Sequence, residues 1–557
     1  MSFIARFFEN LAAHPERVFV TEVRGSSLVP TNGHELSRLV GLARKALRER
    51  GVSPGDRVVF IANNSARWVA LDLAILAEGG IAVPLYTRQA PAELVGMIGD
   101  CTAKLVVCED EALAAPLRAL GLEPVLLEAM FVAEHAVVEP PRLHASDELV
   151  TIIYTSGTSG EPKGVTYSVA NVDYMLPVIR DAIGALLGDA LRHAGPSASG
   201  EPVDRVFHYL PFCFAGSRMV LWMTLFRASG IYLSTDLTKL VDEMKAAKPH
   251  YYLNVPFLLE RVRLGVEKKV AEKPAPIRAL WNRGKAAYLK SLTGELPLVD
   301  KAILSISKKL VFQKIRAQIG SDLICLICGS AALPEDTQRW FEMLGIPVYQ
   351  VYGLTETTAI VTMDKPGAPV TERLAKVGWP IPGVKLRLGE EDELQVLGPN
   401  IFPSYWGREA ATAETRTADG WFRTGDQAEL GKDSQLKLIG RVKNVLVPLS
   451  GHNVAPEPIE ERLLRLPGVE QAVVFGHAKK HLVAVLTGDG LSVERLMPEV
   501  ERINQDLPFY KRVRKIHVTA ERLTPENGCL TANQKLKRKA IERHFAAALA
   551  PLWEADA

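Results

Sequence analysis

The alternation of strand-like and helix-like segments near the N-terminus is the feature of this sequence that most limits its fold. Residues 34–51 (HELSRLVGLARKALRERG) carry apolar positions at helical spacing and end at a glycine. Short apolar runs at 56–63, 81–86 and 103–110 predict strands, and 66–80 predicts a second helix between the first two. Strands that alternate with helices form mostly parallel sheets with helices packed on them. The sequence therefore predicts an α/β fold with a large N-terminal domain of mostly parallel sheets.

The length of the chain and a change of pattern near its end indicate a second domain. The chain has 557 residues, whereas single cores stop growing at roughly 250–300 residues. We expect a large domain over 1–440 and a small α+β domain over 441–557. The pattern in the small domain predicts strands at 445–449, 469–477, 481–489 and 513–519, with helices from about 456 and over 493–506.

The net charge and the distribution of apolar residues argue against nucleic-acid binding, secretion and a membrane span. The net charge of +2 gives no reason to expect nucleic acid as a partner. The N-terminal segment lacks the apolar core of a signal peptide. No apolar run is as long as the roughly 20 residues that are needed to cross a bilayer. We therefore expect a cytoplasmic protein that acts on small molecules. Its oligomeric state and any peripheral contact with a membrane stay open.

A single CxxC pair is the one cysteine pattern in the sequence. Cys325 and Cys328 lie inside the apolar run DLICLICGS, and no second pair of ligands stands at metal-binding spacing. Free cysteine packs as a small apolar residue. We expect a buried strand here, without metal or redox chemistry, and no disulfides among the six cysteines.

The segment YTSGTSGEPKGV (154–165) has the residues of a phosphate-binding loop. Its glycines let the backbone approach an anion closely, its hydroxyl groups donate hydrogen bonds, and Lys163 adds a positive charge. The apolar run 149–153 predicts a buried strand that leads into the loop. The order of residues is not GxxxxGK[ST], so the loop is not a Walker loop. A Ser/Gly-rich surface linker is the alternative.

Two further motifs follow. In QVYGLTETT (350–358), Tyr352 offers a flat face to a purine, Thr355 a donor to a phosphate oxygen, and Glu356 a carboxylate of the kind that Mg²⁺ prefers. The alternative is a strand-to-turn segment with a solvent-facing glutamate. In DGWFRTGDQAEL (419–430), Asp426 could accept hydrogen bonds from both hydroxyls of a ribose, although a TGD turn by itself is common. Arg441 lies where it could bridge ribose and phosphate charge.

These motifs, in this order and over nearly the whole chain, resemble those of the acyl-adenylate-forming (AMP-binding) superfamily, and within it the long-chain fatty acyl-CoA synthetases. The resemblance implies a small, mobile α+β C-terminal domain, and Mg²⁺, ATP and coenzyme A as cofactor and substrates. The catalytic residues it implies are Lys535, Lys163, Thr158 and Glu356, of which Glu356 binds the metal. The ATP-binding residues it implies are Thr155, Ser156, Gly157, Thr158, Lys163, Gly329, Ser330, Ala331, Tyr352, Gly353, Thr355, Asp426 and Arg441.

The resemblance also assigns roles near the C-terminus and in the acyl site. It implies that Lys443 is the hinge between the domains and that Gly451 lines the route of the coenzyme A thiol. Lys535 matches the family's C-terminal catalytic lysine, with Lys537 as the alternative because the usual SGK context is replaced by Asn533-Gln534-Lys535. The segment HYLPFCFAGSRM (208–219) has no histidine after its proline, so Phe212 or Phe214 takes that place near the acyl group.

The activity implied is that of an ATP-dependent ligase, which activates a long-chain fatty acid as acyl-AMP and transfers the acyl group to coenzyme A, with release of AMP and pyrophosphate. The basic, helical stretch 267–319 is similar to an insertion that long-chain synthetases carry. Three alternatives stay open: a ligase that loads an acyl carrier protein, an acyl-CoA synthetase for another carboxylic acid, and a non-catalytic nucleotide-binding protein.

Overall fold

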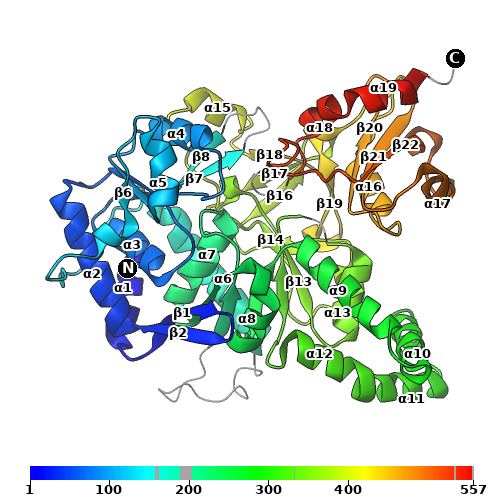
Figure 1. Ribbon diagram of the computed structural model, residues 1–557, viewed down its shortest axis with the longest axis horizontal. Coiled ribbons are helices and arrows are strands. Elements are labelled where there is room, and N and C mark those ends of the chain that lie inside the picture. Colours follow the sequence, from blue (N-terminus) through cyan, green and yellow to red (C-terminus); the bar gives the residue numbers. More distant parts are fainter. Residues whose placement is uncertain (157–161, 189–203, 332, 532–534, 555–557) are drawn as a thin grey trace. The chain divides into compact units, whose positions relative to one another are not determined.

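The computed structural model describes residues 1–156, 162–188, 204–331, 333–531 and 535–554 (Figure 1). These residues divide into two compact units. The first consists of Met1–Lys385, Val396–Gly420 and Asp433–Gln435, and the second of Leu386–Gln395, Trp421–Lys432 and Leu436–Ala557. The fold is of the predicted α/β class, with large, mostly parallel sheets in the first unit and smaller sheets in the second. The domain boundary at residue 441 stays a prediction.

A six-stranded sheet in the first unit confirms the alternation seen near the N-terminus. Its strand order is β6-β5-β3-β4-β7-β8, and every neighbouring pair is parallel except β7 and β8. The strands are β3 Arg57–Ile61, β4 Ile81–Leu85, β5 Leu105–Cys108, β6 Val125–Leu126, β7 Leu149–Ser156 and β8 Pro162–Ser168. The helices that alternate with them are α2 Gly33–Glu49, α3 Ala66–Ala77, α4 Pro91–Asp100 and α5 Glu111–Arg118.

A nine-stranded sheet forms the other half of the first unit. Its order is β15-β14-β13-β12-β11-β9-β10-β1-β2, with parallel pairs from β13 to β1 and antiparallel pairs at both ends. Cys328 ends β12 and Cys325 lies just before it, both buried, as predicted. The strands are β1 Val18–Arg24, β2 Ser27–Asn32, β9 Arg205–His208, β10 Gly230–Ser234, β11 Tyr251–Asn254, β12 Leu326–Cys328, β13 Val348–Tyr352, β14 Thr362–Met363 and β15 Trp379–Pro380.

Helices cover the sheets of the first unit. Residues 256–320 are mostly helical and include a π-helical turn, η4 Lys308–Phe312, which agrees with the helical stretch predicted at 267–319. The remaining helices of the unit are α1 Phe3–Ala13, α6 Val169–Leu187, α7 Ala215–Phe226, α8 Leu240–Ala247, α9 Pro256–Ala271, α10 Ala275–Ser291, α11 Leu298–Ser307, α12 Gln313–Gly320, α13 Glu335–Met343, α14 Val370–Arg373 and α15 Glu409–Glu414.

The core of the first unit contains an ion pair. Every residue of α3 except Arg67 is buried, because the helix contacts both β4 of one sheet and β1 of the other. Asp72 of α3 is fully buried and accepts hydrogen bonds from Arg218 of α7 and from Trp222 Nε1, the latter at 3.0 Å. The Arg218 guanidinium also lies over the rings of Trp68 and Trp222. A charge without a partner at this depth would be strongly destabilising.

The second unit has two small sheets. The four-stranded sheet has the order β16-β17-β18-β19, and the three-stranded sheet the order β20-β21-β22, with β21 and β22 parallel. The expected strand at 445–449 is wrong: the segment makes only an isolated bridge, between Leu446 and Val454. The elements are β16 Lys385–Leu388, β17 Glu393–Leu397, β18 Phe422–Leu430, β19 Leu436–Arg441, α16 Glu457–Leu463, β20 Gln471–Phe475, β21 Leu482–Thr487, α17 Val493–Gln505, β22 Val513–Thr519, α18 Arg538–His544 and α19 Ala546–Glu554.

Among the helices of the described residues, none combines the length and the apolar character that a membrane span requires.

Candidate active site

Lys163 lies on the hairpin formed by β7 and β8. In the antiparallel register of these strands Thr155 lies opposite Lys163, beside the segment predicted to bind phosphate. Gly164 leaves no room for a side chain, because a Cβ atom there would lie 2.6 Å from Ile152 Cγ2. The hairpin thus fixes the lysine next to the predicted loop. Of the other residues predicted for this loop, Ser156 pairs with Pro162, and Gly157 and Thr158 lie outside the described part of the chain.

A segment from much later in the chain runs along β8. The Thr166 amide donates to the Ser404 carbonyl at 3.2 Å, and the Trp406 amide donates to the Gly164 carbonyl at 2.8 Å. Tyr405, between these two contacts, is 7% exposed. Its ring lies 5.0 Å from Lys163 Nζ, a distance typical of a cation–π contact.

Tyr405 also connects this hairpin to Glu356. The Tyr405 hydroxyl donates a hydrogen bond of 2.8 Å to Glu356 Oε1. Glu356 lies in a single 3₁₀ turn, η5 Thr355–Thr357, just after β13. Lys163, Glu356 and Tyr405 therefore form one group, which we call the Tyr405 cluster. Sequence reasoning identified its first two members and missed the tyrosine that joins them.

The turn that carries Glu356 is held from several sides. The Tyr167 hydroxyl donates to the Thr355 carbonyl at 2.8 Å, and the Phe402 amide donates to the Glu356 carbonyl at 2.9 Å. Gly353 has to be a glycine, because a Cβ atom there would lie 2.1 Å from the Ala359 carbonyl oxygen. The direction of the Glu356 side chain is therefore set by contacts on both sides of the turn.

The predicted adenine segments meet at one edge of the nine-stranded sheet. β12 and β13 are parallel neighbours, and Cys328 pairs with Gln350. The strand β12 is followed by Gly329, Ser330 and Ala331. The strand β13 ends at Tyr352 and is followed by Gly353. Ligands of open α/β sheets bind at the carboxyl ends of the strands. The structure thus brings these two predicted segments together at the edge where a ligand is expected.

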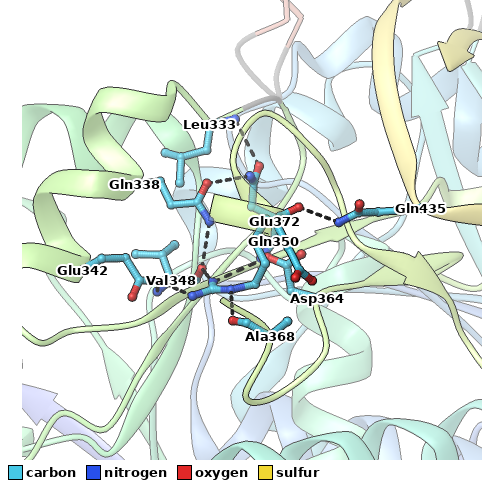
Figure 2. A network of polar contacts seen from close by, with 10 residues as sticks. Leu333, Gln338, Glu342, Val348, Gln350, Asp364, Ala368, Glu372 and Gln435 are labelled. Atoms are coloured by element: carbon cyan, nitrogen blue, oxygen red, sulfur yellow. Dashed lines mark hydrogen bonds and ion pairs between the residues drawn. The ribbon is translucent and has the colours of Figure 1, made fainter. Parts of the chain in front are cut away.

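Gln350 anchors the start of this second segment in a buried polar network (Figure 2). Its amide donates to Asp364 Oδ2 at 2.9 Å, and its side chain donates to Gln338 Oε1 at 3.1 Å. Gln338 in turn donates to the Val348 carbonyl. Since backbone and side chain of Gln350 are both bonded, the network fixes β13 two residues before Tyr352.

Charged side chains complete this network, and Figure 2 labels Glu342 and Asp364 among them. Arg373, 3% exposed, donates to the Val348 carbonyl at 2.7 Å and to Glu342 Oε1 at 2.6 Å. Asp364 is 1% exposed, and Arg373 NH1 lies 3.8 Å from its Oδ2 atom. Burial raises the pKa of Asp364 to about 7, against the lowering effects of the Gln350 amide and of Arg373. No local pattern in the sequence predicts this network, because its members come from four separate segments: α13, β13, the loop after β14, and α14.

The residues present suit a magnesium ion that is bound mainly through phosphate. Among the described residues, no group of three or more His, Cys, Asp or Glu side chains could hold a metal by itself. Glu356 is one carboxylate in a fixed position, with Oε1 held by Tyr405. Mg²⁺ usually takes one or two protein carboxylates, and completes its shell with substrate phosphates and water. A single oriented carboxylate beside Lys163 fits that pattern.

In the second unit, Asp426 and Arg441 face each other across a hairpin. They are partners in the register of β18 and β19, and Arg441 NH1 lies 3.0 Å from Asp426 Oδ1. Arg441 also donates to the Thr424 carbonyl at 2.8 Å. Asp426 is 8% exposed. We call these two residues the Asp426 pair. A carboxylate held by an arginine, as here, is set to accept further hydrogen bonds in its charged form.

The other predicted residues of the second unit lie on turns. Lys443 belongs to the single turn Val442–Asn444 that follows β19, and Gly451 has a φ of +75° in an exposed turn. Lys535 is exposed, and its amide donates to Thr531 Oγ1 at 3.1 Å. Lys537 is also exposed, just before α18. The choice between Lys535 and Lys537 as the catalytic lysine therefore stays a prediction.

The two phenylalanines predicted for the acyl pocket have different surroundings. Phe212 is 1% exposed and stacks on His208, with ring centroids 4.9 Å apart. Burial lowers the pKa of His208 to about 3, so this histidine is neutral in the fold. Phe214 is only partly buried, and its ring lies 5.5 Å from that of Tyr86. Of the two, Phe214 is the one with surface left for a ligand.

Comparison with known proteins identifies the class to which this fold and site belong. A family model described as AMP-binding enzyme matches residues 7–406, and a model described as AMP-binding enzyme C-terminal domain matches residues 443–557. The chain therefore belongs to the AMP-binding enzyme family of adenylate-forming ligases, as its motifs predicted.

Individual relatives are similar over most of their length. The long-chain-fatty-acid–CoA ligase FadD15 of Mycobacterium bovis is 27% identical, with 99% of this chain and 97% of the relative covered. The chloroplastic long-chain-fatty-acid–[acyl-carrier-protein] ligase AEE15 of Arabidopsis thaliana is 24% identical, with 89% and 79% covered. The solved structure of O-succinylbenzoate coenzyme A synthetase (MenE) from Bacillus subtilis with ATP and magnesium has a TM-score of 0.72, 20% identity, and coverage of 96% and 98%.

Proposed function

We propose that this protein is a long-chain fatty acid–CoA ligase that forms an acyl-AMP intermediate and releases AMP and pyrophosphate. The Tyr405 cluster is the observation that carries the proposal, because it unites a lysine and a carboxylate suited to magnesium and polyphosphate. The similarity to FadD15, a long-chain-fatty-acid–CoA ligase that aligns over 97% of its length, supports the choice of acid and acceptor. Since the reaction uses ATP and coenzyme A, we also propose that the protein acts in the cytoplasm.

In the first half-reaction, the fatty acid carboxylate attacks the α-phosphorus of ATP. Lys163 binds the β- and γ-phosphates and so stabilises the departing pyrophosphate, and Glu356 would hold Mg²⁺, which neutralises phosphate charge when bound. Tyr405 keeps the Glu356 carboxylate in position through its hydroxyl. Catalysis of this kind consists mainly of positioning and charge stabilisation.

The nucleoside is bound by the residues predicted for adenine and for ribose. The adenine packs against Tyr352 and the backbone of Gly329 and Ser330, and Thr355 donates to a phosphate oxygen. Asp426 accepts hydrogen bonds from the ribose hydroxyls, with Arg441 beside it to neutralise charge. A charged acceptor makes such bonds stronger than neutral ones.

In the second half-reaction, Lys535 has to leave the acyl-AMP so that coenzyme A can reach it. Lys535 binds the carboxylate and the α-phosphate during adenylation, and it leaves when the C-terminal domain turns about Lys443. The thiol of coenzyme A then reaches the acyl carbonyl past Gly451. A domain rotation of this kind lets one site perform two reactions in turn.

Two alternatives differ from this proposal only in a substrate. AEE15 is named as a ligase for an acyl carrier protein, and MenE as a synthetase for O-succinylbenzoate. The same ATP site is compatible with coenzyme A or a carrier protein as the acceptor, and with a fatty acid or an aryl acid as the substrate. The partly buried aromatic pair of Phe214 and Tyr86 favours an apolar acid.

Pyrophosphate release tests the proposal directly. The protein is incubated with ATP and Mg²⁺ and with acetate, octanoate, palmitate or an aryl acid, with and without coenzyme A. We expect turnover with palmitate that depends on coenzyme A. Turnover only with an acyl carrier protein would select the first alternative, turnover only with the aryl acid the second, and no release with any acid would contradict ligase activity.

Separate assays of the half-reactions test the role of Lys535. The variant Lys535→Ala should nearly abolish acyl-AMP formation and should largely retain thioester formation from supplied acyl-AMP. The matched control is Lys537→Ala, an exposed lysine two residues away. An equal loss in both half-reactions, or a larger loss in the control, would assign the role elsewhere.

A further inference from the structure

Asp100 ends helix α4 at a position where an acidic side chain is unfavourable by itself. The carbonyl groups at the C-terminal end of a helix carry a partial negative charge, which repels a carboxylate there. The last turn of α4, all of it described, has no basic residue that would offset this repulsion. Contacts with distant parts of the chain therefore have to stabilise the aspartate, and departures of this kind from local preference are found at functional sites.

Both carboxylate oxygens of Asp100 accept hydrogen bonds, each from a different segment of the first unit. The Tyr154 hydroxyl donates to Oδ2 at 2.7 Å, and Arg408 NH2 donates to Oδ1 at 3.0 Å. Figure 1 shows α4 beside the hairpin of β7 and β8, which carries Tyr154. Burial and the bond to Asp100 raise the pKa of Tyr154, so the phenol stays protonated and is the donor in this bond.

Tyr154 lies beside Lys163 on the hairpin. In the register of β7 and β8, Tyr154 pairs with Gly164, and the next residue, Thr155, pairs with Lys163. A Cβ atom on Gly164 would lie 3.2 Å from Tyr154 Cζ, so the glycine leaves room for the tyrosine ring. Because the ring packs so closely on this glycine, a movement of Tyr154 would also move the backbone next to Lys163.

Arg408 holds the segment that carries Tyr405. The two residues belong to the same turn, in which the Arg408 amide donates to the Tyr405 carbonyl at 3.2 Å. The ring of Trp406, between them, lies 5.4 Å from the guanidinium of Arg57. Arg57 Nε donates in turn to the carbonyl of Cys101, directly after α4, at 2.9 Å. The end of α4 therefore holds this segment at two points.

We propose that Asp100 is a positioning residue of the ATP site, which fixes Lys163 and Tyr405 relative to each other by bonding to the two segments that carry them. The position of a group that stabilises a leaving pyrophosphate matters on a scale of about 1 Å. Asp100 has this role only if Lys163 binds the phosphates, so the role rests on the proposed function. The alternative is an ion pair that only stabilises the fold.

Pyrophosphate release by variants of Asp100 tests the role. Asp100→Ala releases both segments and should lower kcat by about 10- to 100-fold, the effect expected when a reacting group is misplaced by about 1 Å. The affinity for ATP, measured by calorimetric titration, should fall less, because the residues proposed to bind the nucleoside lie elsewhere. Asp100→Asn should keep most of the activity, because its oxygen can accept from Arg408 while its amide donates to the Tyr154 hydroxyl.

The matched control is Glu148→Ala. Glu148 bonds to an arginine just before the amino end of β7, whereas Asp100 bonds to Tyr154 near the carboxyl end of the same strand. Arg142 NH2 donates to Glu148 Oε1 at 3.0 Å, and the exposed fractions of the two carboxylate side chains are similar, 32% for Glu148 and 24% for Asp100. We expect the control to keep its activity, and an equal loss in both variants would overturn the proposal.

A double-mutant cycle separates positioning from a general loss of stability. In a Lys163→Ala background, Asp100→Ala should lower kcat by only about threefold or less, because the lysine that it positions is already gone. Melting temperatures of all variants are measured, and the assays are run well below the lowest of them. Destabilisation of the fold would act equally in both backgrounds, so equal effects of Asp100→Ala with and without Lys163 would overturn the proposal.

Binding measurements distinguish a failure of this role from a failure of the ligase function. A wild type that binds ATP with Mg²⁺ but activates none of the acids would contradict the ligase function only. The role of Asp100 would then be read from the binding of pyrophosphate with Mg²⁺, which Asp100→Ala should weaken and Asp100→Asn should largely preserve. An active wild type whose Asp100→Ala variant is equally active would overturn the role alone, and a wild type that binds neither ATP nor pyrophosphate would overturn both.

Discussion

The Tyr405 cluster and the Asp426 pair each bring a carboxylate and a cationic side chain together, but their residues come from different distances along the chain. Lys163, Glu356 and Tyr405 come from three distant parts of the chain, and they meet because a segment around Tyr405 runs along β8. Asp426 and Arg441 are register partners on the single hairpin of β18 and β19. The first depends on the packing of a whole unit and the second on one local turn.

This difference bears on how each arrangement responds to a substitution. In the Tyr405 cluster, one tyrosine serves both charged residues, so its loss affects the lysine and the carboxylate together. In the Asp426 pair, the hairpin backbone keeps the two residues opposite each other even when one side chain is changed. We therefore expect coupled effects in the cluster and nearly independent effects in the pair.

The largest effect is expected from Lys163→Ala. Loss of the charge beside the leaving pyrophosphate should lower kcat/KM for pyrophosphate release about 100- to 1,000-fold, as for other groups that stabilise developing charge. The control is Lys104→Ala, an exposed lysine of the same unit. If Lys163→Ala kept its activity, or if the control lost as much, Lys163 would not bind the phosphates.

A smaller effect is expected from Asp426→Ala. Loss of a charged acceptor for the ribose hydroxyls should weaken ATP binding by about 2–3 kcal/mol, which corresponds to a roughly 30- to 150-fold change. The measurement is a calorimetric titration with ATP, with Asp433→Ala on a nearby turn as the control. Unchanged affinity for ATP would remove Asp426 from the ribose site.

The substitution Tyr405→Phe tests the coupling within the cluster. It removes the hydroxyl that holds Glu356 and keeps the ring next to Lys163, so the apparent affinity for Mg²⁺ should fall by about 1–1.5 kcal/mol, or roughly tenfold. The dependence of the initial rate on Mg²⁺ concentration measures this. The affinity for ATP in the absence of metal should stay the same, and a fall in it would show that Tyr405 acts on the nucleotide instead.

The substitution Asp364→Asn is expected to change stability rather than binding, and its effect depends on pH. The folded-state pKa of Asp364 is about 7, above its ordinary value of 3.8, so its contribution to stability is present below about pH 4 and is lost as the pH rises through 7. The loss amounts to at most about 1.4 kcal/mol for each pH unit in that window. An asparagine has no such dependence and still accepts the hydrogen bond from the Gln350 amide.

The melting temperatures of the wild type and of Asp364→Asn, measured from pH 4 to pH 8, check this prediction. The wild type should lose stability relative to the variant as the pH rises. Since Asp364 bonds to Gln350, below the segment with Tyr352 and Glu356, the activity of the wild type should follow the same trend. Parallel curves for the two proteins would show that Asp364 does not titrate in this range.

The sequence predicted local structure well where one short segment was sufficient. The strand at 513–519 and the helix near 493–506 were found within a residue or so of their observed bounds. The segment 445–449 failed for a physical reason: its apolar residues suggested a strand, but only Leu446 finds a bridge partner. An apolar run becomes a strand only when a neighbouring strand is available to pair with it.

The residues of the candidate site also fall into those that a short segment predicts and those that it does not. The motifs of the sequence are sufficient to predict four site residues: Lys163, Glu356, Asp426 and Arg441. Glycine-rich, Tyr-Gly and Thr-Gly-Asp turns can be recognised from the order of residues alone, and each indicates a particular chemistry. Tyr405 could not be named, since SYWGR has no pattern that indicates a bond to a distant glutamate. The basic, helical character of residues 267–319 is also visible in the sequence and is found in the structure.

The sequence by itself determined the family, the α/β class and the types of side chain that the reaction needs, because these depend on composition, periodicity and short motifs. Only the tertiary structure decided which of these side chains touch. It joined Lys163 to Glu356 through Tyr405, and it put a buried carboxyl, Asp364, under the strand that leads to Tyr352. Contacts between residues far apart in the chain arise from packing of whole elements, and no local pattern encodes them.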